Sequence, residues 1–272
     1  DLHLSIRRQR QMCIRDSVDD ASHPLDVERR VRDAMTQVSV GEAEAVEREV
    51  CEYLGQAALR GWFRRPGGFF ADHLKRYSKG RRQAPVYWPL STPSGSYTLW
   101  LYYLRLSDQT LFKAVNDLIE PKLQQIASQA AALRSRTSRS PADTAELERL
   151  SDFEIELTEF RGELLHLAKV WKPNLNDGVV ITAAPLWKLF QLKPWQKKLK
   201  ETWESLESGE YDWAHLAYSL WPDRVREKCK HDKSLAIAHG LEDLYQEPPA
   251  TARKKRGRKA KVADPDLLED AE

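Results

Sequence analysis

A long seam of large apolar residues constrains this chain more than any other feature of its sequence. The members of the seam alternate three and four positions apart over three heptads: Leu150, Phe153, Leu157, Phe160, Leu164, Leu167 and Trp171. This spacing places them on one face of a long helix. A second stretch of helical periodicity precedes the seam, and only the polar segment 135–143 separates the two. We therefore expect an antiparallel helical hairpin over residues 111–171, with Pro121 kinking or restarting its first helix.

Shorter elements are expected before this helical hairpin. Residues 25–59 have helical periodicity, and two runs rich in Tyr, Trp and Leu, 85–90 and 96–104, flank the turn segment 92–95. Strand-like runs on either side of a Pro- and Gly-containing turn are typical of a β-hairpin. The aromatic content of these runs predicts that the β-hairpin is covered on both faces.

The region after the helical hairpin is rich in tryptophan, since most of the nine Trp residues lie between Trp171 and Trp221. Buried Trp usually packs in a core, so we expect a helical bundle here, with 179–182 as a short strand. The predicted fold is mainly α with a small β-hairpin, comprising an antiparallel helical hairpin, a Trp-rich helical bundle and a disordered basic then acidic tail. The expected divisions are 1–17, 18–110, 111–171, 172–246 and 247–272.

Composition excludes several classes of protein. The 272 residues carry a net charge of only +2, so the average charge predicts no particular partner. Cys13, Cys51 and Cys229 are far apart, which indicates neither a disulfide framework nor a zinc site. No apolar run approaches the ~20 residues that a membrane span needs. These features favour a cytoplasmic protein without membrane contact. Motifs such as GxSxG, HExxH or a phosphate-binding loop do not occur, so the sequence predicts no catalytic site.

The first residues differ in character from the rest of the chain. Residues 7–17 resemble the conceptual translation of a transposase-end adapter used in DNA sequencing libraries, and they show no helical or strand periodicity. The alternative is a basic N-terminal arm that binds nucleic acid. We expect residues 1–17 to be an adapter artefact, and we expect the natural protein to continue upstream.

Basic residues concentrate between positions 60 and 82, where eight cations stand against one acid, Asp72, for a local charge of +7. Phe69, Phe70 and Tyr77 are interleaved with them. Clustered cations beside aromatic rings are suited to neutralising a phosphate backbone. The alternative is a solvated face that shields a neighbouring acidic surface. The cations of this segment are Arg60, Arg64, Arg65, Lys75, Arg76, Lys79, Arg81 and Arg82.

A second basic run lies in the tail, at 253–261, and an acidic end follows at 264–272. Arg256-Gly257-Arg258 resembles the core of an AT-hook, in which two Arg side chains enter a narrow minor groove. Lys259 replaces the usual Pro, so non-specific phosphate binding is predicted over groove reading. The predicted DNA contacts are Arg64, Arg65, Lys75, Arg76, Lys79, Arg81, Arg82, Arg256, Gly257 and Arg258.

Other chemically capable residues are expected to be structural. The Trp residues at 187, 195, 203, 213 and 221 are spread over several elements, which favours core packing over base stacking. His215 is predicted to be a structural histidine. Asp177 lies in a turn-like sequence and could reach a cleft, but no catalytic partner is evident nearby.

Several segments together resemble one protein family. They include RRQAPVYWPL at 81–90, NLNDGVV at 174–180, YDWAHLA at 211–217 and SLAIAH at 234–239. In order along residues 60–245, the chain resembles the C-terminal region of large class I adenine-specific DNA methyltransferases, particularly the PglX type of BREX phage-exclusion systems. Further matches are at 96–103, 116–123 and 184–187.

The resemblance implies a division of labour between this segment and an upstream domain. In the family, the upstream domain binds S-adenosylmethionine and methylates the exocyclic amine of adenine. The glycine-rich turn and the Asn-Pro-Pro-aromatic motif of that domain have no counterpart here, so no catalytic residue and no cofactor are predicted for this chain itself. Its predicted role is to bind double-stranded DNA and recognise the target of a phage-defence or restriction–modification methyltransferase.

Two other functions remain open from the sequence. One is a protein–protein scaffold, in which the helical hairpin and Trp-rich helices recruit other phage-defence components. The weaker alternative is a self-contained enzyme with an unfamiliar site. DNA affinity that falls with salt favours the DNA-binding role, whereas salt-insensitive binding to a protein favours the scaffold.

Overall fold

The structure is a computed structural model that describes residues 16–38, 42–79, 82–138, 140–210, 218 and 220–247. The chain divides into two compact units, Asp1–Val225 and Arg226–Glu272. The fold class is as expected, because helices dominate the described residues and a small antiparallel sheet accompanies them. None of the helices that the structure describes combines the length and the hydrophobicity that a membrane span requires.

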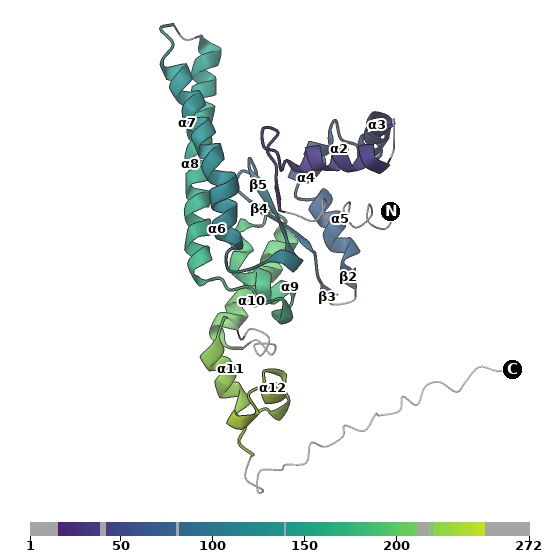
Figure 1. Ribbon diagram of the computed structural model, residues 1–272, viewed down its shortest axis with the longest axis vertical. Coiled ribbons are helices and arrows are strands. Elements are labelled where there is room, and N and C mark those ends of the chain that lie inside the picture. Colours follow the sequence, from purple (N-terminus) through teal and green to yellow (C-terminus); the bar gives the residue numbers. More distant parts are fainter. Residues whose placement is uncertain are drawn as a thin grey trace, which may run out of the picture. The chain divides into compact units, whose positions relative to one another are not determined.

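A three-stranded sheet lies at the centre of the first unit (Figure 1). Its strands are β1 (Ser17–Val18), β4 (Tyr87–Ser91) and β5 (Thr98–Tyr102), in the order β1-β5-β4 with antiparallel pairing. The predicted β-hairpin is therefore confirmed as β4–β5. Residues 7–17 show no strand periodicity, yet Ser17 pairs with Trp100 in β1 and is part of the sheet.

Both faces of the sheet are covered, as its aromatic content predicts. Side chains alternate between the two faces of a strand. Leu99 and Leu101 therefore share one face, while Trp100 points to the other, and all three are almost fully buried. On its own face Trp100 meets the rings of Phe63 and Phe69 edge-on, at centroid distances of 6.1 and 5.2 Å.

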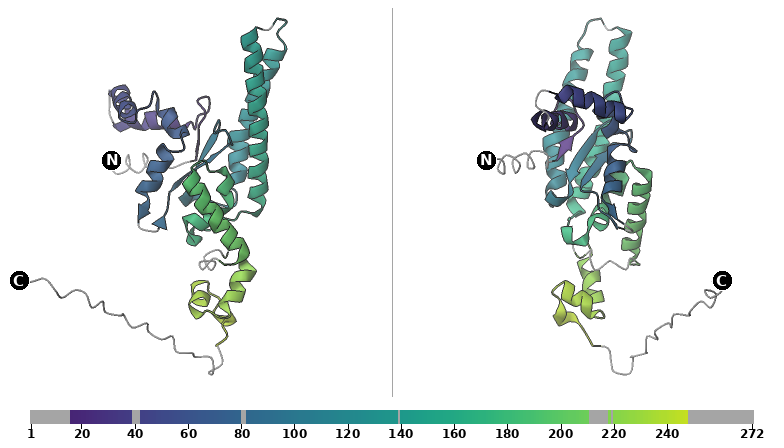
Figure 2. Two further views of the ribbon diagram at one scale, coloured as in Figure 1. Left: turned by 180° about the vertical axis from the view of Figure 1, so that it is seen from behind. Right: turned by 90° about the vertical axis from the view of Figure 1, so that its right-hand side faces the viewer.

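The predicted helical hairpin is present and runs well beyond the sheet (Figures 1 and 2). Its first arm comprises α6 (Thr110–Ala114), a π-helical turn (Val115–Ile119) and α7 (Glu120–Arg134); its second arm is α8 (Pro141–Val170). Pro121 restarts the α-helix, since it lacks the N–H that would continue the hydrogen-bond ladder. The π-helical turn lies directly before it. Ser140 and Asp143 form a capping box at the start of α8.

The region between β1 and β4 contains several short helices. They are α2 (Val27–Val38), α3 (Ala43–Tyr53), α4 (Leu59–Arg64) and α5 (Phe69–Arg76). A two-stranded ribbon, β2 (Ser78–Lys79) and β3 (Arg82–Gln83), follows α5 directly. A 3-10 turn, Tyr103–Arg105, joins β5 to the helical hairpin.

The tryptophan-rich region is helical, as expected, but it contains no strand among its described residues. Residues 179–182 are in helix α9 (Val179–Ala183), so the predicted strand is wrong. The carbonyl of Thr182 accepts a 2.9 Å hydrogen bond from the buried Trp171 indole N–H. The other elements are 3-10 turns Leu175–Asp177 and Ala184–Leu189, then α10 (Lys193–Ser208) and α11 (Pro222–Cys229), which spans the boundary between the units.

The described part of the second unit is small. It contains the end of α11, helix α12 (Lys233–Ala238) and a 3-10 turn, Glu242–Leu244. Asp232 caps α12, because its carboxylate accepts a hydrogen bond from the Leu235 amide at 3.0 Å. The predicted tail, 247–272, lies outside the described residues except for Glu247.

The seam on α8 gives a direct test of the fold. Replacing the fully buried Leu157 by Ala should lower the free energy of unfolding by about 2–5 kcal/mol, because the substitution leaves a cavity in the core. Ile155 is on the same helix but 57% exposed, so Ile155→Ala should change stability by less than about 0.5 kcal/mol. Urea unfolding of the two variants measures both effects, and equal losses would contradict the assigned seam.

Candidate nucleic-acid interface

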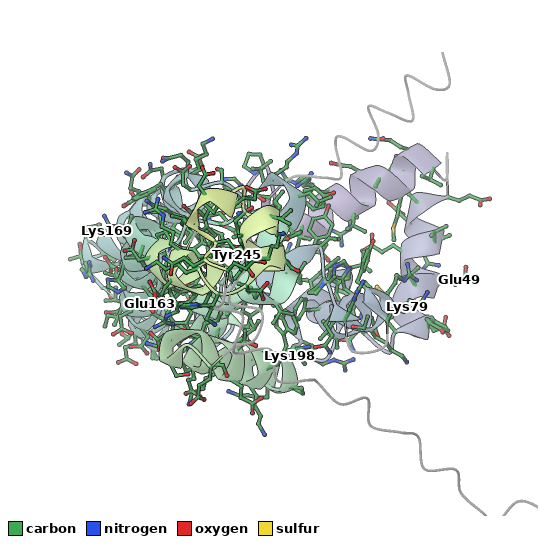
Figure 3. All side chains as sticks on the ribbon, turned by 90° about the horizontal axis from the view of Figure 1, so that it is seen from below. Glu49, Lys79, Glu163, Lys169, Lys198 and Tyr245 are labelled. Carbon is green, nitrogen blue, oxygen red and sulfur yellow. The ribbon has the colours of Figure 1, made fainter. Side chains whose placement is uncertain are left out.

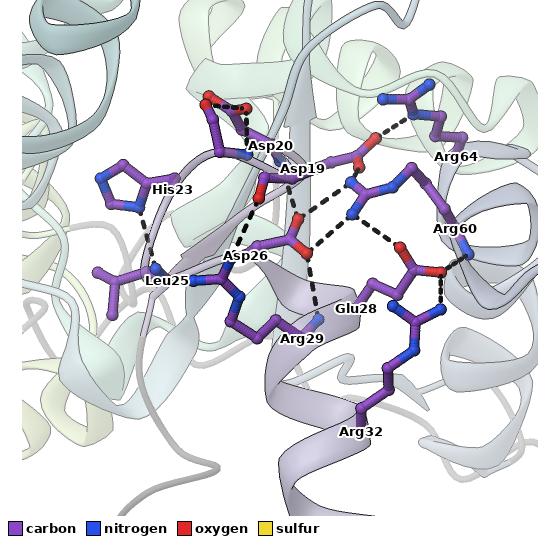
Figure 4. A network of polar contacts seen from close by, with 12 residues as sticks. Asp19, Asp20, His23, Leu25, Asp26, Glu28, Arg29, Arg32, Arg60 and Arg64 are labelled. Atoms are coloured by element: carbon purple, nitrogen blue, oxygen red, sulfur yellow. Dashed lines mark hydrogen bonds and ion pairs between the residues drawn. The ribbon is translucent and has the colours of Figure 1, made fainter. Parts of the chain in front are cut away.

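Arg60, the first cation of the basic segment, is enclosed by carboxylates from earlier in the chain (Figure 4). Its Nη2 atom lies 2.8 Å from Asp26 Oδ2 and 2.7 Å from Glu28 Oε2, and its Nη1 atom pairs with Asp19. The three carboxylate side chains are at most 7% exposed. Burial alone would lower the pKa of Arg60, but the hydrogen bonds to Asp26 and the surrounding negative charges raise it. Arg60 therefore holds α4 to the N-terminal segment.

Arg64, one of the predicted DNA contacts, also has a partner within the fold. Its Nε atom pairs with the second carboxylate oxygen of Asp19, so one buried acid is shared by two arginines. A buried carboxylate left without a partner is strongly destabilising. Arg64 is therefore committed to an internal ion pair, although about half of its side chain remains exposed.

The other described cations of this segment form an exposed group, which we call the cationic surface. Its members are Arg65, Lys75, Arg76, Lys79 and Arg82. None of them pairs with an acid among the described residues. Arg81 lies outside the described part of the chain, as do Arg256, Gly257 and Arg258 in the tail.

The ribbon β2–β3 brings two of these cations together. Lys79 lies directly opposite Arg82, and Ser78 lies opposite Gln83. Like charges in directly opposed positions destabilise a β-ribbon. The ribbon continues from α5, since Ser78 Oγ donates to the Leu74 carbonyl at 2.5 Å and the Ala84 amide donates to the Tyr77 carbonyl at 3.0 Å. An anion bound at this ribbon would relieve the repulsion.

His73 fixes the position of α5 against the sheet. Its Nε2 atom accepts hydrogen bonds from the backbone amides of Val86, at 3.0 Å, and Tyr87, at 3.1 Å. The side chain is buried, and this burial, aided by the charge of Arg76, lowers the pKa of His73 to about 4. The imidazole is therefore neutral near pH 7, which leaves Nε2 free to accept both bonds. The cations at the end of α5 are thus attached to a fixed helix.

Lys198 on α10 lies beside the ribbon, although it is not among the residues predicted from the sequence. Its Nζ atom donates to Gln83 Oε1 at 2.6 Å, across 115 positions of sequence. Burial lowers the pKa of Lys198. No local pattern singles out this lysine, because three other lysines lie in the first half of the same helix.

The described tryptophans of the C-terminal region are mainly structural. Trp171 and Trp195 are almost fully buried, and Trp203 packs on Trp221 with a centroid distance of 5.5 Å. Trp187 is half-buried, with the ammonium of Lys200 5.4 Å from its ring centroid. Trp213 and His215 lie outside the described residues, and Asp177 is buried rather than placed in an open cleft.

An apolar groove of about 490 Å³ lies between α2 and the aromatic residues beneath it. One wall is the apolar stripe of α2, and the opposite wall includes Phe63, Phe69 and Trp100. Arg30 contributes a charge to the groove, but its guanidinium donates to the Asp16 carbonyl and to Ser17. The groove therefore does not extend the cationic surface.

Comparison with known proteins adds no family to these observations: no protein-family model matches the chain, and no curated protein matches it. Among the described residues, no group of His, Cys, Asp or Glu side chains is arranged to hold a metal ion. The site must therefore be interpreted from its own geometry. It exposes the cationic surface and the aromatic ring of Tyr77 to solvent.

The burial of His73, with the nearby charge of Arg76, predicts how stability depends on pH. The unfolded histidine takes up a proton near its ordinary pKa of 6.5, whereas the folded one does so only near 4. Acidification between these values therefore favours unfolding, and the full contribution of His73 is present above pH 6.5. The His73 contribution should fall by at most ~1.4 kcal/mol per pH unit over this window.

The matched variant is His73→Gln, whose side-chain oxygen can still accept a hydrogen bond but does not titrate. Unfolding free energies measured by urea at several pH values should show a smaller acid loss in the variant than in the original protein. Parallel profiles for the two proteins would contradict a neutral, buried His73.

Proposed function

We propose that this chain is the DNA-binding, target-recognition part of an S-adenosylmethionine-dependent adenine-specific DNA methyltransferase in a phage-defence or restriction–modification system. The observation that carries the DNA-binding part is the cationic surface, whose five members are exposed and have no acid partner among the described residues. Phosphate groups of DNA would supply the missing counter-charges and release bound salt ions as they do so.

The clustering of unpaired cations argues against an ordinary solvated face. Several exposed cations on the long helices have acids beside them, since Arg149 pairs with Glu146, Lys197 with Glu201, and Lys200 with Glu204. Other exposed cations of these helices, such as Arg134 and Lys169, form no ion pair among the described residues, but neither lies in a described segment of similar length with as many unpaired cations. Between positions 65 and 82 the only acid is Asp72, and it forms no ion pair among the described residues.

Helix polarity accounts for only part of the cationic surface. Lys75 and Arg76 lie in the last turn of α5, where the helix dipole favours positive charge. The same explanation covers Arg65, which is the C-cap of α4, but it does not apply to Lys79 or Arg82, which lie in the ribbon. The opposed pair in the ribbon even reduces stability locally, as functional sites often do.

The methyltransferase assignment is supported by the sequence resemblance alone. In this proposal, another domain of the methyltransferase binds S-adenosylmethionine and transfers the methyl group, and this chain holds double-stranded DNA for it in the cytoplasm. Adenine methylation in cells that express the gene tests that assignment separately from DNA binding.

The DNA-binding proposal predicts a change in salt dependence. Replacing Arg76, Lys79 and Arg82 together by Gln should weaken binding to duplexes of unrelated sequence alike. It should also reduce the slope of log affinity against log salt by about 0.9 for each phosphate that the variant no longer neutralises. Fluorescence anisotropy with labelled duplexes over a salt series measures both quantities.

The control variant replaces three exposed cations elsewhere, Arg134, Lys169 and Lys172, by Gln. Lys169 lies on the opposite side of the view from Lys79 (Figure 3), so this variant should retain the original slope. Equal slopes of log affinity against log salt for the original protein and both variants would show that the cationic surface does not bind DNA. Salt-insensitive binding to a phage-defence protein, without DNA binding, would instead favour the scaffold.

A further inference from the structure

A continuous column of aromatic rings leads from the core to the cationic surface. Phe69, His73 and Tyr77 are four residues apart along α5 and its C-cap. Phe69 stacks on His73 at 5.4 Å between centroids, and His73 contacts Tyr77 at 4.6 Å. At its inner end, Phe69 meets Trp100 of the sheet at 5.2 Å.

The outer end of this column is open. Trp100 is 2% exposed and His73 is 8% exposed, whereas Tyr77 is 45% exposed. The hydroxyl of Tyr77 has no hydrogen-bond partner among the described residues. A large aromatic side chain at the surface is therefore available on the part of its ring that His73 does not cover.

The backbone of Tyr77 is held on both sides. Its amide donates to the His73 carbonyl at 3.0 Å, and its carbonyl accepts from the Ala84 amide at 3.0 Å. His73 is itself fixed by the amides that begin β4. The ring therefore needs little ordering before it can bind a flat partner.

The charges around Tyr77 indicate the chemistry of that partner. Lys75 and Arg76 immediately precede it, and Lys79 follows two positions later. All three are exposed members of the cationic surface. A ligand that combines a flat ring with nearby phosphates is a nucleotide, and ring stacking beside cations is how proteins bind unpaired strands.

We propose that Tyr77 stacks on an unpaired base of single-stranded DNA while the neighbouring cations hold its phosphates. This inference rests on the proposed DNA binding. In an intact duplex the faces of the bases are covered by their neighbours, so Tyr77 contributes to single-strand affinity and not to duplex affinity. The chain therefore binds two forms of DNA through one set of cations, and Tyr77 distinguishes between them.

The test compares Tyr77→Ala with the original protein on two probes, a single-stranded oligothymidylate and a fully paired duplex. Single-strand affinity should fall at least about fivefold, the lower end of the effect of losing one stacked base. Duplex affinity should change less than about twofold. Tyr77→Phe keeps the ring and should retain single-strand affinity.

Two further variants keep the test independent of folding. Tyr77→Leu preserves an apolar contact with His73 but removes the aromatic face, so it should behave like Tyr77→Ala. Tyr53→Ala removes a tyrosine that is 90% exposed on α3 beside Glu49 and Glu52, and it should change neither affinity. Thermal unfolding of each variant verifies that it is folded.

The outcomes distinguish failure of the stacking role from failure of the proposed DNA binding on which it rests. Unchanged single-strand affinity in Tyr77→Ala, with salt-dependent binding of both probes intact, would overturn the stacking role alone. Equal losses for both probes would also overturn it. If the original protein binds neither probe at low salt, the proposed DNA binding itself fails.

Discussion

Burial of the β4–β5 hairpin on both faces is the constraint on which the rest of the structure depends. A sheet this small cannot leave a face carrying Trp100 in water, and α4 and α5 cover that face through Phe63 and Phe69. The helical hairpin lies toward the other face, where Tyr97 contacts Phe153 of α8. Two members of the cationic surface follow from this packing, since α5 covers the sheet and carries Lys75 and Arg76 outward.

Ion pairs within the fold determine which cations are available to a ligand. Arg60 and Arg64 neutralise Asp19, which is buried, and so they stabilise the attachment of α4. A count of charges between 60 and 82 includes both arginines but cannot include an acid that lies 41 and 45 positions earlier. Such a count therefore overstates the exposed charge, and Lys198, which reaches the ribbon from α10, was missed for the same reason.

Local periodicity predicted the parts of the fold that local rules determine. The seam centred on Leu157 and the turn between β4 and β5 were both predictable, because each depends on residues close together in sequence. Residues 179–182 were not, since a short run of β-branched residues fits a buried helix as well as a strand. Its helix is set by tertiary contacts, including the hydrogen bond from Trp171 to Thr182. The sequence places Tyr77 among cations, but only the structure shows that its side chain is exposed at the end of the ring column.

The most direct test of the account is amide hydrogen exchange of the protein with and without saturating duplex DNA at low salt. The central claim is that the cationic surface around α5 and the ribbon contacts DNA. Exchange should slow between residues 69 and 83 and stay unchanged in α3 and along the outer half of the helical hairpin. Slower exchange confined to those distant elements, or no change anywhere, would contradict the claim.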